Sequence, residues 1–156
     1  MRTTFAVMIG LRPYTLWINR SLPKSRKTMP QYILIVDDDP DIRQILQDRL
    51  ESYGYLVDTA EDGLAAIQKI ERRTPSGVFL DIRMPGMSGI EVLGRIRDRY
   101  RTLSVVIVTA TNTADLSGSP VHTAAQACLV KPFDMPQIRQ VAEQCFGPAP
   151  GSEHHR

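Results

Sequence analysis

Four short apolar segments of this sequence each end in polar residues that can take part in phosphate or metal chemistry. In chain order these residues are Asp37 and Asp38, Asp81, Thr109 and Lys131. A carboxylate can attack phosphorus as a nucleophile and can also ligate a divalent cation. A hydroxyl and an ammonium can bind and neutralise a phosphoryl group, and phosphoryl transfer depends mainly on such positioning and neutralisation. The set therefore predicts a phosphoryl-transfer site, provided that the fold brings the segment ends together.

The grouped carboxylates also predict a metal ion. Carboxylates that lie close together repel one another, and one of them is normally driven to bind a proton. Mg2+ removes this repulsion because it prefers oxygen ligands, including carboxylates, carbonyls and water. Taken singly, Asp39 is a helix cap, Asp81 a turn residue and Lys131 an exposed turn residue. Only their joint position at matching segment ends favours chemistry over these structural roles.

From residue 31 onward, strand patterns alternate with helix patterns. Short apolar runs predict five strands, at residues 32–36, 55–60, 77–80, 104–108 and 127–130. Helices are predicted to begin at Asp39–Pro40, Gly63, Ser88 and Asp134, the last two with capping-box spacing. The apolar faces predicted for the first three are Ile42, Ile45, Leu46 and Leu50; Leu64, Ile67 and Ile70; and Ile90, Leu93 and Ile96.

The segment around residues 114–126 is the poorest helix candidate. Gly118 and Pro120 fall inside it, and a proline in a helix interior costs about 3 kcal/mol or more. We expect this helix to be short, to begin late or to be broken.

Five strands alternating with five helices predict an α/β fold with a five-stranded, doubly wound parallel sheet in a three-layer sandwich. Ligands of such sheets bind at the carboxyl ends of the strands, near the point where strand order reverses. The polar residues at the segment ends all fall on this rim.

Over residues 31–146 the sequence resembles the response-regulator receiver family, whose fold is flavodoxin-like. The matching segments are 33–40, which reads ILIVDDDP, 80–89, which reads LDIRMPGMSG, 106–110, which reads VIVTA, and 131–133, which reads KPF. The combination is specific, although each segment alone would be weak.

The resemblance implies a role for each site residue. Asp81 would accept the phosphoryl group, and Asp37, Asp38, Asp81 and the backbone carbonyl of Arg83 would hold Mg2+, with Asp37 acting partly through water. Thr109 would bind the phosphoryl group and Lys131 would pair with it. The bond between Lys131 and Pro132 is a candidate cis peptide, which proline permits at modest cost.

One position departs from the family pattern. Receivers commonly carry an aromatic switch residue three positions before the lysine, and Cys128 stands there. A thiol cannot repeat the inward and outward swing of an aromatic ring. We interpret Cys128 as a small buried hydrophobic residue rather than a redox site.

The two ends of the chain differ from the rest. Six of the 19 basic residues and none of the 17 acidic residues lie in residues 1–30, so the remainder carries a net charge of −4. This segment lacks strand or helix periodicity, and Met29 precedes the first strand directly. We interpret 1–30 as a basic leader that is disordered or lies before the true start, 31–146 as the domain, and 147–156 as a disordered tail.

Composition narrows the setting. The acidic domain does not suggest direct DNA binding, and no apolar run is long enough to span a membrane. Cys128 and Cys145 form no metal-ligand or disulfide pattern, which favours a cytoplasmic protein.

The function predicted is a stand-alone, Mg2+-dependent receiver that is not an enzyme. A sensor histidine kinase or a histidine phosphotransfer protein would donate the phosphoryl group, and a separate output protein would receive the signal. One alternative is a phosphorylation-independent interaction module of the same fold, which Cys128 and the broken helix favour. A haloacid-dehalogenase-like phosphatase is a poorer alternative, because it needs an acidic motif on a strand after the lysine and only Asp134 follows closely.

Overall fold

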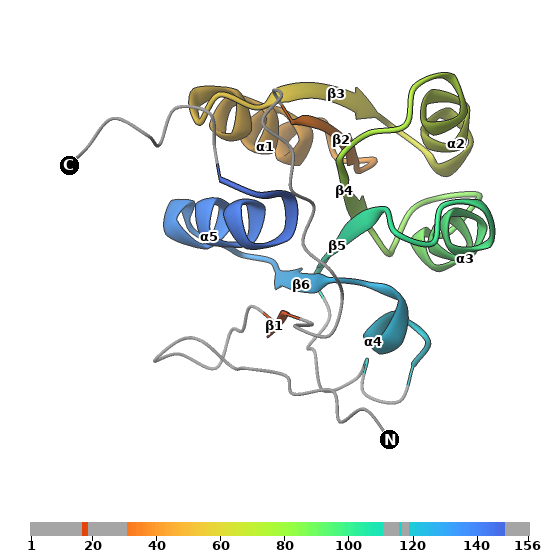
Figure 1. The fold of residues 1–156 in the computed structure, drawn as a ribbon. Coiled ribbons are helices and arrows are strands. Elements are labelled where there is room, and N and C mark those ends of the chain that lie inside the picture. Colours follow the sequence, from red (N-terminus) through yellow and green to blue (C-terminus); the bar gives the residue numbers. More distant parts are fainter. Residues whose placement is uncertain (1–16, 19–30, 111–115, 117–118, 149–156) are drawn as a thin grey trace.

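The computed structural model describes residues 17–18, 31–110, 116 and 119–148, which form one sheet with helices on both faces (Figure 1). The strands are β1 (Trp17–Ile18), β2 (Tyr32–Val36), β3 (Leu56–Ala60), β4 (Gly77–Asp81), β5 (Ser104–Thr109) and β6 (Ala127–Val130). The helices are α1 (Pro40–Ser52), α2 (Gly63–Arg72), α3 (Gly89–Arg99), α4 (Val121–Ala124) and α5 (Met135–Phe146).

The order of strands across the sheet is β1-β6-β5-β4-β2-β3, and β2 to β6 are all parallel to one another. The predicted α/β fold with five parallel strands is therefore confirmed, and each predicted strand agrees to within one residue at its ends. The chain leaves β2 for β3 on one side and then crosses to β4 on the other. Strand order thus reverses between β2 and β4, where a ligand site is expected.

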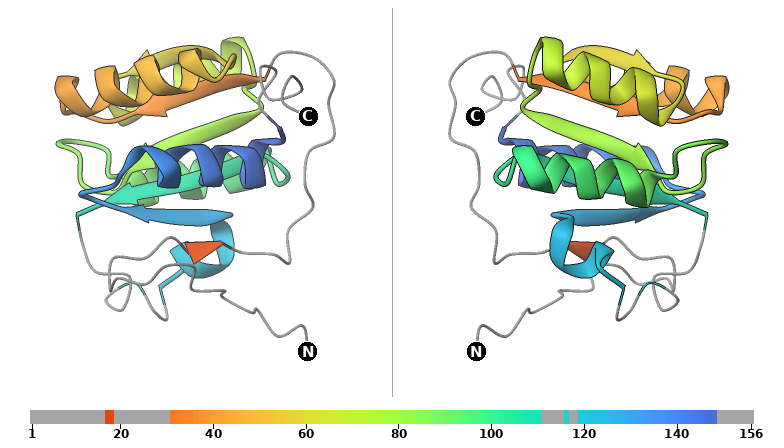
Figure 2. Two further views of the ribbon diagram at one scale, coloured as in Figure 1. Left: turned by 90° about the vertical axis from the view of Figure 1, so that its left-hand side faces the viewer. Right: turned by 90° about the vertical axis from the view of Figure 1, so that its right-hand side faces the viewer.

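Helices cover both faces of the sheet: α1 and α5 pack on one face, and α2, α3 and the short α4 lie on the other (Figure 1 and Figure 2). One core joins Ile33, Ile35, Phe79 and Val106 to Leu46 and Leu50 of α1 and to Val141 and Phe146 of α5. The other core joins Leu34, Val36, Val78 and Leu80 to Ile70 of α2 and to Leu93 and Ile96 of α3. Because successive side chains of a strand point to opposite faces, a strand covered on both faces must be apolar throughout.

Three residues predicted on apolar helix faces are instead exposed. Ile45, Leu64 and Ile90 are 45%, 57% and 43% exposed. The buried face of α2 consists of Gly63, Ala66 and Ile70, so small residues that the apolar periodicity did not include form part of it. The remaining residues of those faces are buried or partly buried.

The expected short, late helix is confirmed: α4 has four residues, follows Pro120 and has no side-chain cap. One side chain of α3 holds its end. The Arg97 guanidinium donates to the carbonyl oxygens of Ala124 at 2.6 Å and Leu103 at 2.7 Å, and to Gln126 Oε1 at 3.2 Å. The junction between α4 and β6 therefore depends on a contact from a distant part of the chain. Gly118 and most of residues 111–118 lie outside the described residues.

One strand was not expected. The sequence predicts no strand in residues 1–30, but Trp17–Ile18 forms β1, which pairs antiparallel with β6. Two residues are too few to show a periodic pattern. The rest of the leader and residues 149–156 lie outside the described residues, so the predictions for both ends remain predictions. No described helix has the length and apolar character needed to cross a bilayer.

Candidate functional site

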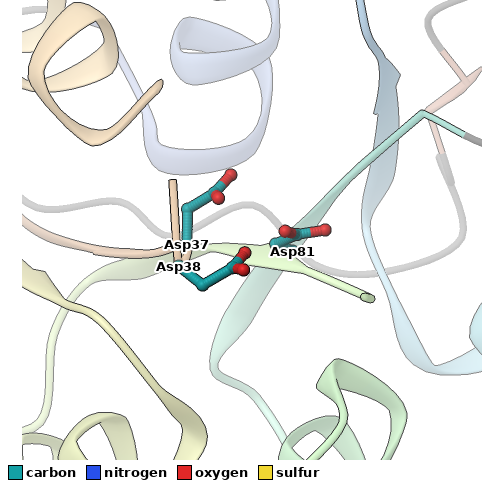
Figure 3. Close-up of side chains that lie close together, drawn as sticks. All are labelled: Asp37, Asp38 and Asp81. Carbon is teal, nitrogen blue, oxygen red and sulfur yellow. The ribbon is translucent and has the colours of Figure 1, made fainter. Parts of the chain in front are cut away.

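Three carboxylates meet at the point where strand order reverses. Asp37 follows β2 directly, Asp38 is next to it, and Asp81 is the last residue of the adjacent β4. Figure 3 shows the three side chains at this rim. One oxygen from each lies within 4.8 Å of the others. We call Asp37, Asp38 and Asp81 the acid cluster.

Asp37 is the most firmly held member of the cluster. It is 1% exposed, and its Oδ1 accepts a hydrogen bond from the backbone N–H of Asp39 at 2.9 Å. Its Oδ2 accepts from Lys131 Nζ at 3.0 Å, and its backbone carbonyl accepts from Arg43 Nη1 at 2.6 Å. These contacts fix both the carboxylate and the loop that carries Asp38. Sequence reasoning missed Arg43, whose only sequence signal is a cation in the first turns of the helix after the acids.

Asp81 is 5% exposed and carries an unusually basic carboxylate. Burial, and after it the nearby charge of Asp37, raise its pKa to about 6 against the opposing effects of Lys131 and the backbone N–H of Arg83. Lys131 Nζ lies 3.7 Å from Asp81 Oδ2, and the Arg83 N–H donates to Oδ1 at 3.1 Å. At neutral pH this carboxylate is mostly ionised but poorly compensated, so a cation beside it is favoured.

Asp38 opens the cluster to solvent. Asp37 and Asp81 are buried, whereas Asp38 is exposed. Three carboxylates and one ammonium leave a net charge of −2, and every donor is a hard oxygen atom. This donor set fits Mg2+, which binds oxygen ligands and usually keeps several water molecules. Arg83 contributes its N–H to Asp81, while a metal-binding role for its carbonyl remains a prediction.

The other side of the site comes from β5 and β6. Thr109 ends β5, is fully buried, and follows Val108, the residue in register with Asp81. The backbone N–H of Lys131 donates to the Thr109 carbonyl at 2.7 Å, so the two residues are tied together at the rim. The bond between Lys131 and Pro132 is cis, as the sequence allowed. The structure thus brings all the predicted site residues to one place.

A glycine positions the loop after Asp81. Gly89 begins α3, and its N–H donates to the carbonyl of Ile82 at 2.9 Å. A Cβ at this position would collide with the carbonyl oxygen of Asp81. The capping box of Ser88 and Glu91 was predicted and is confirmed, but the close approach of Gly89 is visible only in three dimensions.

Comparison with known proteins identifies a family. Residues 33–143 match the response regulator receiver domain. Sporulation initiation phosphotransferase F of Bacillus subtilis is 34% identical over 116 residues, which are 74% of this chain and 94% of that protein. The DNA-binding transcriptional regulator NtrC of Escherichia coli K12 is 35% identical over 114 residues, which are 73% of this chain. The chain spans only 24% of the length of NtrC.

Solved structures show the same fold. The response regulator TrrA of Thermotoga maritima, in complex with Mg2+ and BeF, superposes with a TM-score of 0.68 at 35% identity, covering 74% of this chain and 98% of that chain. The chemotaxis protein CheY4 of Vibrio cholerae superposes with a TM-score of 0.70 at 27% identity, covering 75% of this chain and 99% of that chain.

Proposed function

The chain belongs to the response-regulator receiver family of two-component signalling, and we propose that it accepts a phosphoryl group on Asp81. The observation that carries this proposal is the environment of Asp81, a buried carboxylate with a raised pKa beside Asp37 and Lys131. In such an environment the charge of the Asp81 carboxylate is poorly compensated, so binding of a cation beside it is favourable. Carboxylates with perturbed pKa values of this kind are typical of functional sites.

In the proposed reaction, a carboxylate oxygen of Asp81 attacks the phosphorus of a phosphohistidine. The phosphorus–nitrogen bond breaks as the phosphorus–oxygen bond forms, and the electron pair of the broken bond stays on the histidine nitrogen. The Arg83 N–H at 3.1 Å from Oδ1 holds the orientation of the attacking carboxylate. The product is an aspartyl phosphate, and no side chain of this protein has to give up a proton.

Mg2+ would be held by Asp37, Asp38, Asp81 and the backbone carbonyl of Arg83, and when bound it would neutralise charge on the phosphoryl oxygens. Lys131 is proposed to move from its contact with Asp37 Oδ2 toward the phosphoryl oxygens, since its Nζ already lies 3.7 Å from Asp81. Thr109 is proposed to donate its hydroxyl to another of these oxygens. Both shifts would alter the β5 and β6 side of the rim.

We further propose that the protein works as a stand-alone cytoplasmic relay. The donor would be a sensor histidine kinase or a histidine phosphotransfer protein, and a separate output protein would read the signal without direct DNA contact by this chain. The Bacillus relative supports this view, because the match covers 94% of a protein that is itself called a phosphotransferase. The protein would assist its own phosphorylation and dephosphorylation but would not turn over a phosphate ester.

A second candidate is a receiver-fold interaction module that does not depend on phosphorylation. It is favoured by the four-residue α4 and by Cys128, a buried thiol at the position of the aromatic switch. Burial raises the pKa of Cys128 to about 12, so the thiol is un-ionised and does not suggest redox chemistry. The two candidates differ in whether binding of an output protein changes when Asp81 is phosphorylated.

The test of the main proposal is phosphorylation by a small-molecule phosphodonor, read as intact mass. Wild-type protein in Mg2+ is expected to gain one phosphoryl group, and to gain none when the metal is chelated. Asp81→Asn should gain none, whereas Asp48→Asn should behave as wild type because Asp48 is an exposed residue of α1 away from the rim. Equal labelling of Asp81→Asn and wild type would assign the nucleophile elsewhere.

A further inference from the structure

The two outer edges of the sheet are protected in different ways. At the β3 edge, Lys69 Nζ donates to the Thr59 carbonyl at 2.6 Å and to Asp58 Oδ1 at 2.7 Å, and most of the strand is partly exposed. A lysine at an edge strand is a common device against unwanted strand pairing. At the other end of the parallel strands, all four residues of β6 are buried and apolar. An uncovered edge of this composition would invite pairing with another strand.

That edge is covered by the chain itself. β1 pairs antiparallel with β6, with Trp17 in register with Cys128 and Ile18 with Ala127. Cys128 is also in register with Ile107 on the opposite side, so β6 is paired along both edges at this position. The segment with six basic residues and no acid therefore contributes a strand to the sheet of a domain that carries a net charge of −4.

β6 leads directly into the functional site. Lys131 follows its last residue, Val130, and is three residues from Cys128. The backbone N–H of Lys131 is bonded to the Thr109 carbonyl, and its ammonium contacts Asp37 at 3.0 Å and Asp81 at 3.7 Å. A displacement of β6 along or across the sheet must therefore move the only ammonium found within 4 Å of the acid cluster in the described residues.

We propose that the outer edge of β6 is a strand-docking surface occupied by the chain's own residues 17–18, and that docking of β1 and occupancy of the acid cluster strengthen each other. The second half of this proposal rests on the proposed function. Docked β1 holds β6 in the sheet and so keeps Lys131 in position for an anion on Asp81. A phosphoryl group adds negative charge to a domain whose net charge of −4 is opposite in sign to that of residues 1–30, which favours docking further.

Because β1 pairs with β6 over only two residues, its docking is weak enough to be shifted by a change at the site. A strand of two residues forms few hydrogen bonds and is not stable by itself. If docking raises the affinity of the acid cluster for a phosphoryl analogue by some factor, linkage requires that the analogue raise docking by the same factor. Both directions can therefore be measured in the full-length chain.

Trp17 provides the probe, because it is the only tryptophan of the chain. Its fluorescence and its quenching by acrylamide report on whether β1 is docked. We expect full-length protein in Mg2+ to show weaker quenching after beryllofluoride is added, since the analogue on Asp81 strengthens docking. The matched variants are Ile18→Pro, which disrupts strand pairing, and Ile18→Val, which keeps a β-branched residue at the same position.

In buffer alone, Ile18→Pro should show stronger quenching of Trp17 than wild type. In Mg2+, its affinity for beryllofluoride should fall by about fivefold or more, which is the lower range of allosteric coupling. Ile18→Val should stay within about twofold of wild type in both measurements. Circular dichroism of Ile18→Pro checks that the domain itself remains folded.

Two outcomes overturn the inference. Equal quenching in wild type and Ile18→Pro would mean that β1 is not docked in solution. Stronger quenching in Ile18→Pro with unchanged beryllofluoride affinity would mean that docking is not coupled to the site. If wild type itself binds no beryllofluoride, the proposed function fails and the coupling fails with it, while the quenching comparison in buffer still decides whether residues 17–18 cover β6.

Discussion

The two halves of the functional rim are built differently. The acids come from the ends of β2 and β4, and the helices nearest in the chain, α1, α2 and α3, have 10 to 13 residues and side-chain caps. Thr109 and Lys131 come from the ends of β5 and β6, which are joined through the uncapped, four-residue α4. The half that would hold the nucleophile and the metal is fixed by the capped helices next to it in the chain. The half that would respond to phosphorylation, which we call the responsive half, is held by contacts from distant segments such as Arg97 and β1.

The difference shows how one fold can combine a rigid site with an adjustable one. Carboxylates that share a metal ion must be placed in advance, because each has to be held against repulsion from the others. A group that reports an added charge must instead be able to shift. Arg97, β1 and the Asp37–Lys131 pair are the contacts that set the resting position of the responsive half.

The largest expected effect comes from breaking the acid half. Asp38→Asn should lower the affinity for Mg2+ by about 100-fold or more, since loss of a direct ligand should exceed the 10- to 100-fold cost typical of outer-shell changes. Calorimetric titration with Mg2+ measures this. Asp39→Asn is the matched control, because Asp39 caps α1 and asparagine caps helices equally well. Similar losses in both variants would show that the effect comes from the loop rather than from the ligand.

A second change in the acid half acts through packing. Gly89→Ala should destabilise the protein by about 3 kcal/mol, because the added Cβ meets the backbone of Asp81 and Ile82. It should also slow phosphorylation, because the carbonyl that must move belongs to Asp81, the proposed phosphoacceptor.

Gly94→Ala provides the contrast in the same helix, where an added Cβ meets nothing within 4 Å. It should stabilise the protein by about 0.5–1 kcal/mol. Urea unfolding gives both free energies. A Gly89→Ala variant as stable as wild type would show that the backbone of Asp81 and Ile82 leaves room for a side chain at position 89.

The responsive half should tolerate change without loss of phosphoryl acceptance. Arg97→Met should destabilise the protein by about 2 kcal/mol, because three backbone carbonyls lose a charged donor. Mg2+-dependent labelling of Asp81 should nevertheless stay within about twofold of wild type. Arg95→Met, an exposed neighbour in α3, should change stability by less than about 0.5 kcal/mol. A strong loss of labelling in Arg97→Met would mean that the two halves are not separable.

The smallest expected effect is a pH dependence of stability in metal-free protein. The pKa of Asp81 is raised to about 6 in the folded state, above a value near 4 in the unfolded chain. Between these values the folded protein binds more protons, so the contribution of Asp81 is complete below about pH 4 and is lost as pH rises through 6. Two pKa units correspond to nearly 3 kcal/mol, and because solvent reaches the site beside the exposed Asp38, we expect the loss to be about 1–2 kcal/mol.

Asp81→Asn removes this titration. Its stability relative to wild type should therefore increase by about 1–2 kcal/mol between pH 4 and pH 7 in chelator, as measured by urea unfolding. A difference in unfolding free energy that stays constant across this range would show that folding does not raise the pKa of Asp81. The same comparison in Mg2+ should give a smaller difference, because the cation compensates the ionised carboxylate.

The sequence was sufficient to predict the fold and the meeting of the site residues. Apolar runs of strand length alternated with capped helices, and the ends of parallel strands necessarily share one rim. The burial of Ile45, Leu64 and Ile90 was predicted wrongly, because periodicity gives the direction of a helix face but not its width. The chemical roles assigned to Asp81, Thr109 and Lys131 remain predictions that the experiments above address.

The missed features share one cause. The contact of Arg43 with the Asp37 carbonyl depends on how far a side chain reaches back across a loop. The requirement for Gly89 depends on a backbone that passes close to it from another segment. β1 consists of two residues whose partner lies more than one hundred residues later. None of these leaves a local pattern, because each is created by packing between distant parts of the chain.

The pair formed by Lys131 and Asp37 has a consequence for how the protein is made. Its two members are separated by 94 positions in the chain. As the chain emerges from the ribosome, the whole acid cluster is exposed long before its ammonium partner has been synthesised. The early part of the sheet must therefore assemble against the mutual repulsion of its carboxylates. Arrival of the last parallel strand both completes the parallel part of the sheet and brings the ammonium that offsets part of the site's negative charge, so these two steps coincide in a nascent chain.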